Sequence, residues 1–161
     1  SMPSPLLAPL FGSSAMEAVW SDAATVVAML TFEAALAAAE GEAGVIPASA
    51  VVPITAGCMM LDVDTAALAE AAGLAGNTAI PLVKLATAKV AESDPEAAKW
   101  VHFGATSQDV MDTGLVLQLR EAFKVIEADL GRAMAATATL ARVHRDTPMA
   151  GRTWLQQALP T

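Results

Sequence analysis

The chain has 161 residues, with 17 acidic and 9 basic side chains, 55% hydrophobic residues and only 4% aromatic ones. This length suits one globular domain or less. Alanine supplies 37 residues and tyrosine is absent, and this composition favours helix over strand because Ala loses no side-chain entropy in a helix. We therefore predict an all-α protein.

The charges are unevenly distributed along the chain. Residues 1–83 carry eight acidic and no basic side chains, whereas residues 84–161 carry nine of each. Nucleic acids and anionic membranes are bound through clustered Lys and Arg, so neither partner is expected. The positive start of a secretory signal is also missing, and the single cysteine, Cys58, cannot form an internal disulfide. We expect a cytoplasmic protein.

Helix start and stop signals follow one another along the first hundred residues. Residues 1–14 contain three prolines and no charge, which predicts an extended lead-in. A helix is predicted to begin near Ser13 or Ser14 and to run to about Glu42, and Ser14 followed by Glu17 has the spacing of a capping box. Further helices are predicted by caps, prolines and glycines at 48–56, after Asp64 to about 72, at 78–91, and from Asp94 onward.

A long helix is predicted from about Gln108 to Arg145, because no proline interrupts this stretch and apolar residues recur every three or four positions. At 1.5 Å per residue it is about 57 Å long, more than the diameter of a domain of this size. It is either a core helix of a larger protein or a strut in a multi-chain bundle. Its stripe consists of Val116, Leu119, Phe123, Ile126, Leu130, Ala133, Thr137, Leu140 and His144.

The start of this helix has the residues of an anion site. Thr106 is suited to cap the helix, and Asp109 can reach back in a weaker form of the capping box. The first-turn amides, the hydroxyls of Thr106 and Ser107 and the Gln108 amide are together suited to a carboxylate or phosphate. His102 lies on the approach and can bind an anion or move a proton. An ordinary structural cap remains the alternative.

The segment His102-Phe-Gly-Ala-Thr-Ser-Gln-Asp-Val-Met-Asp-Thr113 resembles the fumarase/aspartase superfamily, in its adenylosuccinate lyase-like branch. Gly76-Asn77-Thr78 with Pro81 and the segment 151–160 agree with it. In adenylosuccinate lyases and fumarases the latter normally contains a histidine linked to acid–base catalysis, where this chain has Trp154. Indole is only a donor. The segment is similar to that of the cycloisomerases that lactonise 3-carboxy-cis,cis-muconate in protocatechuate catabolism.

The resemblance implies a cofactor-independent reaction without a metal, through an intermediate in which a substrate carboxylate holds extra negative charge. Preset hydrogen-bond donors are the expected device for stabilising such charge. The substrate is a tricarboxylate, and Arg152 is the best candidate for bidentate binding of one carboxylate. We take His102 and Ser107 as catalytic candidates. The substrate-binding candidates are Asn77, Thr78, Thr106, Gln108, Arg152, Thr153, Trp154 and Gln156.

The resemblance further implies a homotetramer whose active sites combine three subunits, with a proposed catalytic serine on a Gly-Ser-Ser loop beyond residue 161. We therefore interpret the chain as an N-terminal fragment, inactive alone, with a helical domain at 1–105 and the truncated start of a central helical bundle at 106–161. Two alternatives stay open. One is another superfamily lyase, acting on adenylosuccinate or argininosuccinate, and the other is a non-catalytic helical assembly module.

Overall fold

The computed structural model describes residues 6 and 8–148. Every regular element within these residues is a helix, which confirms the predicted all-α class. The chain divides into two compact units, Ser1–Ala122 and Phe123–Thr161. The last helix, α8, begins in the first unit and continues into the second. The predicted domain boundary between residues 105 and 106 falls just before α8 begins and remains a prediction.

The N-terminal region differs from its prediction in two ways. A short helix, α1 (Ala8–Phe11), occupies part of the predicted extended lead-in. The single helix predicted up to Glu42 is two helices, α2 (Ser14–Val19) and α3 (Asp22–Glu42). The physical reason is a second cap: the Ser21 side chain accepts a hydrogen bond from the Ala24 amide at 3.2 Å and starts a new helix.

The start of α2 agrees with the predicted start near Ser13 or Ser14, but the capping residue is Ser13. The Ser13 side chain, rather than that of Ser14, accepts a hydrogen bond from the Met16 amide at 3.3 Å. The Ser14–Glu17 capping box is therefore wrong by one position. Serine at either place satisfies a free amide of the first turn, so composition alone does not choose between them.

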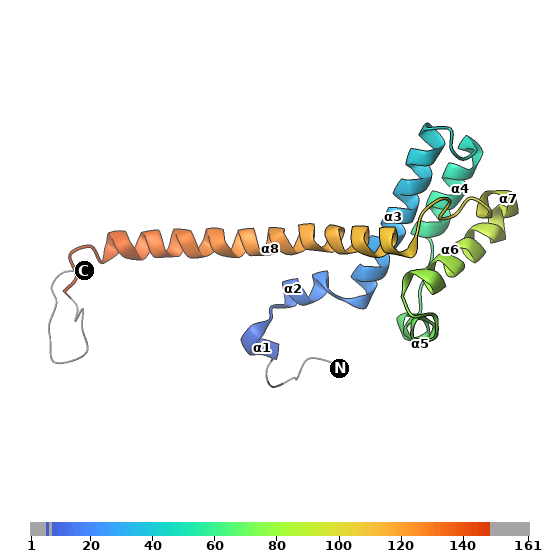
Figure 1. Cartoon of the computed structure of the whole chain (residues 1–161). Helices are drawn as coiled ribbons and strands as arrows, with labels where there is room; N and C mark the ends of the chain where they lie inside the picture. Colours follow the sequence, from blue (N-terminus) through green and yellow to red (C-terminus); the bar gives the residue numbers. More distant parts are fainter. Residues whose placement is uncertain (1–5, 7, 149–161) are drawn as a thin grey trace. The chain divides into compact units, whose positions relative to one another are not determined.

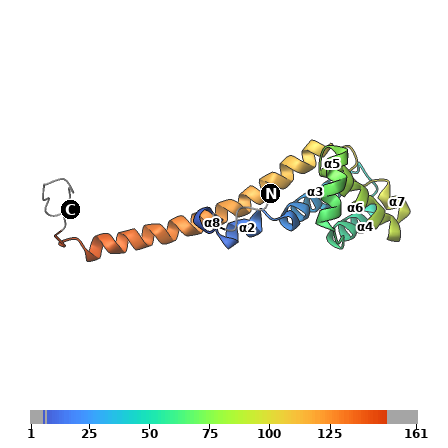
Figure 2. The same ribbon diagram turned by 90° about the horizontal axis from the view of Figure 1, so that it is seen from below.

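Four shorter helices complete the first unit: α4 (Ala48–Met59), α5 (Thr65–Ala75), α6 (Ala79–Ser93) and α7 (Pro95–Ala98). Asp64 and Asp94 cap α5 and α7 through their side chains, as predicted. Gly76 ends α5 with a positive φ of 84°, which glycine adopts without steric cost. In Figures 1 and 2, α3 and α4 lie side by side and α6 lies against α4.

The core of the first unit lies between these helices. Ile54, Leu82 and Val90, from α4 and α6, are essentially inaccessible to solvent. Burying each such side chain stabilises the fold by roughly 1.5–3 kcal/mol. By length and composition, α3 is the one helix in the described part of the chain that satisfies the criteria for crossing a membrane. Its buried side chains, including Met29 and Leu30, pack in this core instead.

The long helix α8 (Ser107–Val143) has 37 residues, which confirms the predicted helix with its ends shifted by one or two positions. Its first part packs closely on α3 because Gly114 has no side chain there. A Cβ at Gly114 would lie 3.1 Å from Met29 Cγ. Further along, the buried Gln118 amide donates hydrogen bonds to the Val19 carbonyl at 2.9 Å and to Thr25 Oγ1 at 3.0 Å. These contacts fix the start of α8 on the first unit.

The predicted apolar stripe of α8 is largely exposed. Phe123 and Leu130 each have 58% of their surface accessible to solvent, and Val116 has 53%. Exposed apolar patches of this extent are rare in monomeric soluble proteins and mark interaction surfaces. The stripe therefore favours association through α8.

Replacing stripe residues by charged ones is expected to prevent self-association. Burying an unpaired charge against an apolar partner is costly, so the double substitution Ile126→Glu and Leu130→Glu should shift the chain toward monomer in sedimentation velocity. Ala128→Glu, on the opposite face of α8, is the matched control and should leave the distribution unchanged. A chain that sediments as a monomer at high concentration without any substitution would contradict the expectation.

Candidate functional site

The loop between α7 and α8 directs a histidine side chain back toward α3. His102 has a φ of 58°, the only positive value among the described non-glycine residues. This backbone conformation costs roughly 1–2 kcal/mol in an L-residue. Its Nδ1 atom lies 2.6 Å from Glu33 Oε1, and the Glu33 side chain is almost completely buried. The predicted site histidine is thus held by a carboxylate that the sequence analysis did not single out.

Burial raises the pKa of Glu33 above its ordinary value, since removing a carboxylate from water disfavours its charged form. The charge of His102 and its hydrogen bond oppose this effect, while the nearby carboxylate of Glu40 adds to it. The second oxygens, Oε2, of both Glu33 and Glu40 are buried without a protein hydrogen-bond partner. The imidazole is therefore the compensating group for the Glu33 charge.

Cys58 belongs to the same buried surroundings but has no reactive role. Burial, and then the negative charge of Glu33, raises the pKa of its thiol to about 11. The thiol is therefore neutral near pH 7 and is not a nucleophile. Among the described residues, no three His, Cys, Asp or Glu side chains lie together so as to hold a metal ion.

The start of α8 has one half of the predicted capping box: Asp109 reaches back to Thr106, whereas the Thr106 hydroxyl donates to Asp109 instead of accepting from a helix amide. Asp109 Oδ2 accepts hydrogen bonds from the Thr106 amide at 2.8 Å and from Thr106 Oγ1 at 3.0 Å. These bonds lower the pKa of the Asp109 carboxyl group, which also feels the charge of His102. Ser107 is half-buried, and its hydroxyl makes no hydrogen bond within the described residues. Of the predicted hydroxyl donors, Ser107 is thus the one left for a ligand.

The other described candidates are engaged in local contacts. The Gln108 side-chain amide donates to Asp112 Oδ1 at 2.6 Å, one turn further along α8. Asn77 Oδ1 accepts a hydrogen bond at 2.9 Å from the amide of Ile80, in the first turn of α6. The Thr78 hydroxyl lies 3.8 Å from Met29 Sδ. The structure therefore brings His102 together with Glu33, and Thr106 with Asp109, while no direct bond joins Asn77 and Thr78 to the start of α8.

The remaining four candidates, Arg152, Thr153, Trp154 and Gln156, lie outside the described residues. Among the described candidates, only His102 can carry a positive charge. The start of α8 therefore supplies the helix dipole and hydrogen-bond donors, and His102 in the preceding loop adds an imidazole.

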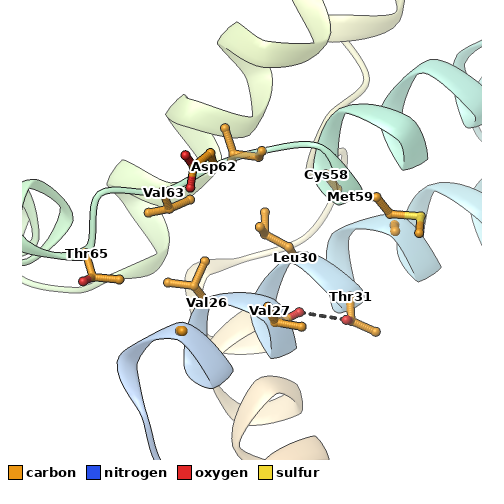
Figure 3. A pocket seen from close by; sticks show the side chains of 12 residues that line it. Val26, Val27, Leu30, Thr31, Cys58, Met59, Asp62, Val63 and Thr65 are labelled. Carbon is orange, nitrogen blue, oxygen red and sulfur yellow. Dashed lines mark hydrogen bonds between the residues drawn. The ribbon is translucent and has the colours of Figure 1, made fainter.

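A separate hollow of about 520 Å³ between α3, α4 and the segment that follows α4 does not suit an anionic ligand. Figure 3 shows its wall of apolar side chains, among them Val26, Leu30 and Met59. The Thr31 hydroxyl at its edge donates to the Val27 carbonyl at 2.7 Å. The lining contains one carboxylate, Asp62, and no Lys, Arg or His. A tricarboxylate would lose its hydration there without gaining a cation.

The sequence analysis missed Glu33 and Glu40, although a signal was present. The two carboxylates lie seven residues apart on α3. Glu33 is three residues after Leu30 and four before Ala37, so it lies on the same face of the helix as these buried apolar residues. An acidic residue on the core face of a helix requires a partner, because an unpaired buried charge is costly. The pattern predicts a partner but does not say which residue it is.

The fold and the site together define an all-α protein in which a long helix begins at a histidine-bearing, hydroxyl-rich turn. A lyase family model matches residues 3–161, and the chain belongs to this family. A 3-carboxy-cis,cis-muconate cycloisomerase from Bradyrhizobium diazoefficiens is 59% identical over 98% of this chain. A nitrosuccinate lyase from Streptomyces davaonensis is 45% identical over 97% of the chain.

The same likeness is found among solved structures. The crystal structure of a 3-carboxy-cis,cis-muconate lactonizing enzyme from Pseudomonas putida has a TM-score of 0.88 and 53% identity, over 95% of this chain. The chain spans only 35% of that enzyme, 35% of the Bradyrhizobium protein and 33% of the Streptomyces protein. The family match thus covers residues 3–161, whereas the chain spans about one third of the length of its relatives.

Removing the charge of Asp109 is expected to loosen the first turn of α8. Asp109→Asn mimics the protonated carboxyl group, so hydrogen exchange of the Thr106 amide and its neighbours should be several-fold faster than in the unmodified protein at pH 7. The pKa of Asp109 is lowered in the folded state. The contribution of its carboxylate to stability is therefore present above the ordinary pKa of about 3.9, and it is lost as the pH falls through the lowered pKa.

The difference in hydrogen-exchange rate between Asp109→Asn and the unmodified protein should therefore shrink as the pH falls through the lowered pKa of Asp109. Asp112→Asn is the control, since Asp112 bonds only the Gln108 side chain. Equal exchange in Asp109→Asn and the unmodified protein at pH 7 would contradict the role of the cap.

Proposed function

We propose that this chain is the N-terminal part of a 3-carboxy-cis,cis-muconate cycloisomerase, which forms a carboxymuconolactone in the protocatechuate branch of the β-ketoadipate pathway. The observation that carries the proposal is the pairing of His102 with buried Glu33 directly before the hydroxyl-bearing start of α8. The 59% identity to the Bradyrhizobium cycloisomerase supports the choice of substrate.

In the proposed reaction, one substrate carboxylate attacks the conjugated double bond and forms the C–O bond of the lactone. A proton is added to the carbon next to another carboxylate, which carries the extra negative charge in the intermediate. His102 holds or moves a proton, and the Ser107 hydroxyl donates a hydrogen bond to the developing charge. The free amides at the start of α8 favour the same charge through the helix dipole.

Substrate binding is assigned to the remaining candidates. Arg152 pairs with one carboxylate, Trp154 forms a wall of the pocket, and the other residues provide polar contacts. These binding residues are Asn77, Thr78, Thr106, Gln108, Thr153 and Gln156. Because Asn77, Thr106 and Gln108 already make local hydrogen bonds, they serve the substrate through their remaining donors and lone pairs, or after exchanging partners.

The complete protein is proposed to be a cytoplasmic homotetramer that needs no cofactor. The exposure of the α8 stripe within the described residues supports self-association. In this arrangement neighbouring subunits supply further cations and the serine loop to each site. The chain alone is therefore expected to lack activity.

A second candidate function is a lyase acting on a different carboxylate. The 45% identity to a nitrosuccinate lyase favours it, because elimination next to a carboxylate requires the same stabilised charge. The two functions differ in whether the substrate's own carboxylate attacks the double bond or a group leaves. A panel containing 3-carboxymuconate, nitrosuccinate, adenylosuccinate and argininosuccinate separates them.

The proposed function is tested with the full-length protein and a matched pair of histidine variants. The unmodified protein should lactonise 3-carboxy-cis,cis-muconate. The reaction is measured as the loss of the diene absorbance of the substrate. His102→Gln keeps a donor for Glu33 but cannot exchange a proton, so kcat should fall by roughly 10²–10⁴. His144→Gln changes the other histidine, which bonds only Thr147, and should retain activity within about twofold.

Two results would contradict the proposal. One is a full-length protein that turns over another member of the panel but not 3-carboxymuconate. The other is turnover of 3-carboxymuconate by residues 1–161 alone, free of full-length enzyme, since this would show that no further segment is needed.

A further inference from the structure

The contact between Glu33 and His102 does more than satisfy a buried charge. The Glu33 side chain has only 1% of its surface exposed, and the His102 side chain has 17%. A carboxylate in that position faces the interior, whereas the imidazole reaches the surface near the start of α8. The pair therefore connects the core of the first unit to the candidate site.

The hydrogen bond at Nδ1 determines which imidazole nitrogen is left for a ligand. Nδ1 lies 2.6 Å from Glu33 Oε1, and an ionised carboxylate can only accept, so the charged form of Glu33 requires the proton on Nδ1. The other nitrogen, Nε2, has no hydrogen-bond partner among the described residues. In the neutral ring Nε2 accepts a proton, and in the charged ring it donates one, so either form acts through this nitrogen.

The backbone supports the same orientation. His102 and Gly104 both have positive φ values, 58° and 69°, and an ideal Cβ at Gly104 would lie 3.8 Å from Glu40 Oε1. The loop thus runs closely past the carboxylates of α3. A strained conformation in a non-glycine residue persists only where surrounding contacts hold it, and Glu33 provides such a contact.

We propose that Glu33 is a positioning residue, which fixes the proton of the His102 imidazole on Nδ1 and presents Nε2 to the carboxylate substrate at the start of α8. This inference rests on the proposed function and deepens it. The groups facing the pair are Glu40 on α3, Cys58 on α4 and Asp109 on α8. Cys58 is neutral near pH 7, so the two carboxylates are the charges that act on the pair.

The test compares Glu33→Gln with Glu42→Gln in the full-length protein. Gln has nearly the shape of Glu but no charge, so it neither fixes the proton on Nδ1 nor stabilises a charged ring. We expect kcat to fall at least about tenfold. In the pH profile of kcat/KM, the limb that reports the Glu33–His102 pair should move toward lower pH. Glu42→Gln removes an exposed charge from the same helix and should change neither.

A double substitution separates positioning from a general structural effect. If Glu33 acts through His102, then Glu33→Gln combined with His102→Gln should be no slower than His102→Gln alone. Fully additive losses would overturn the proposal, and so would a loss in Glu33→Gln with an unchanged pH profile. If Glu33→Gln does not fold, Glu33→Asp is used instead. Asp keeps the charge but has a shorter side chain, so kcat should fall. A kcat equal to that of the unmodified protein would overturn the proposal.

The inference and the proposed function fail in different ways. Absence of lactonisation by the unmodified full-length protein is a failure of the proposed function. A crystal structure of full-length Glu33→Ala tests the positioning role independently of turnover. A displaced His102 imidazole supports the role, and an imidazole that stays in place without its partner overturns it.

Discussion

The contact between Glu33 and His102 is the constraint on which the candidate site depends. It joins the core of the first unit to the loop before α8, and it compensates a carboxylate that is otherwise isolated from solvent. Breaking a buried pair by removing one partner leaves an uncompensated charge, which typically costs about 3–5 kcal/mol. The same contact that satisfies a buried carboxylate thus orients the group that is best suited to chemistry.

The long helix has a different role at each end of its described length. Its start is fixed on the first unit by the close approach at Gly114 and by the hydrogen bonds of Gln118. Further along, the apolar stripe has no cover within the described chain. This exposed stripe is consistent with relatives that are about three times as long as this chain.

Much of the fold could be predicted because its signals are local. Asp64 and Asp94 cap the helices that follow them, and Gly76 ends α5, as their side chains and backbone preferences indicate. The break before α3 was missed because Ser21 competes as a cap inside an apolar run that otherwise continues. The periodicity of apolar residues indicates which face of a helix is buried, but it does not show where one helix ends and the next begins in a new direction.

The candidate site was predictable only in part. The reach of Asp109 back to Thr106 follows from a spacing of three residues and was predicted, whereas the partner of His102 lies 69 residues away on α3. Such a pairing depends on how α3 and the loop before α8 pack together, which no local pattern encodes. The family resemblance supplied a proposed role for the segment from 102 to 113, and the structure added the carboxylate that contacts His102.

The most direct measurement is a crystal structure of the full-length protein with a bound tricarboxylate analogue of the lactone. The account predicts one analogue carboxylate at the start of α8, within hydrogen-bond distance of the Ser107 hydroxyl and of His102 Nε2, with Nδ1 still bonded to Glu33. A helix start closed by protein in the assembled oligomer, with the analogue bound elsewhere, would contradict it.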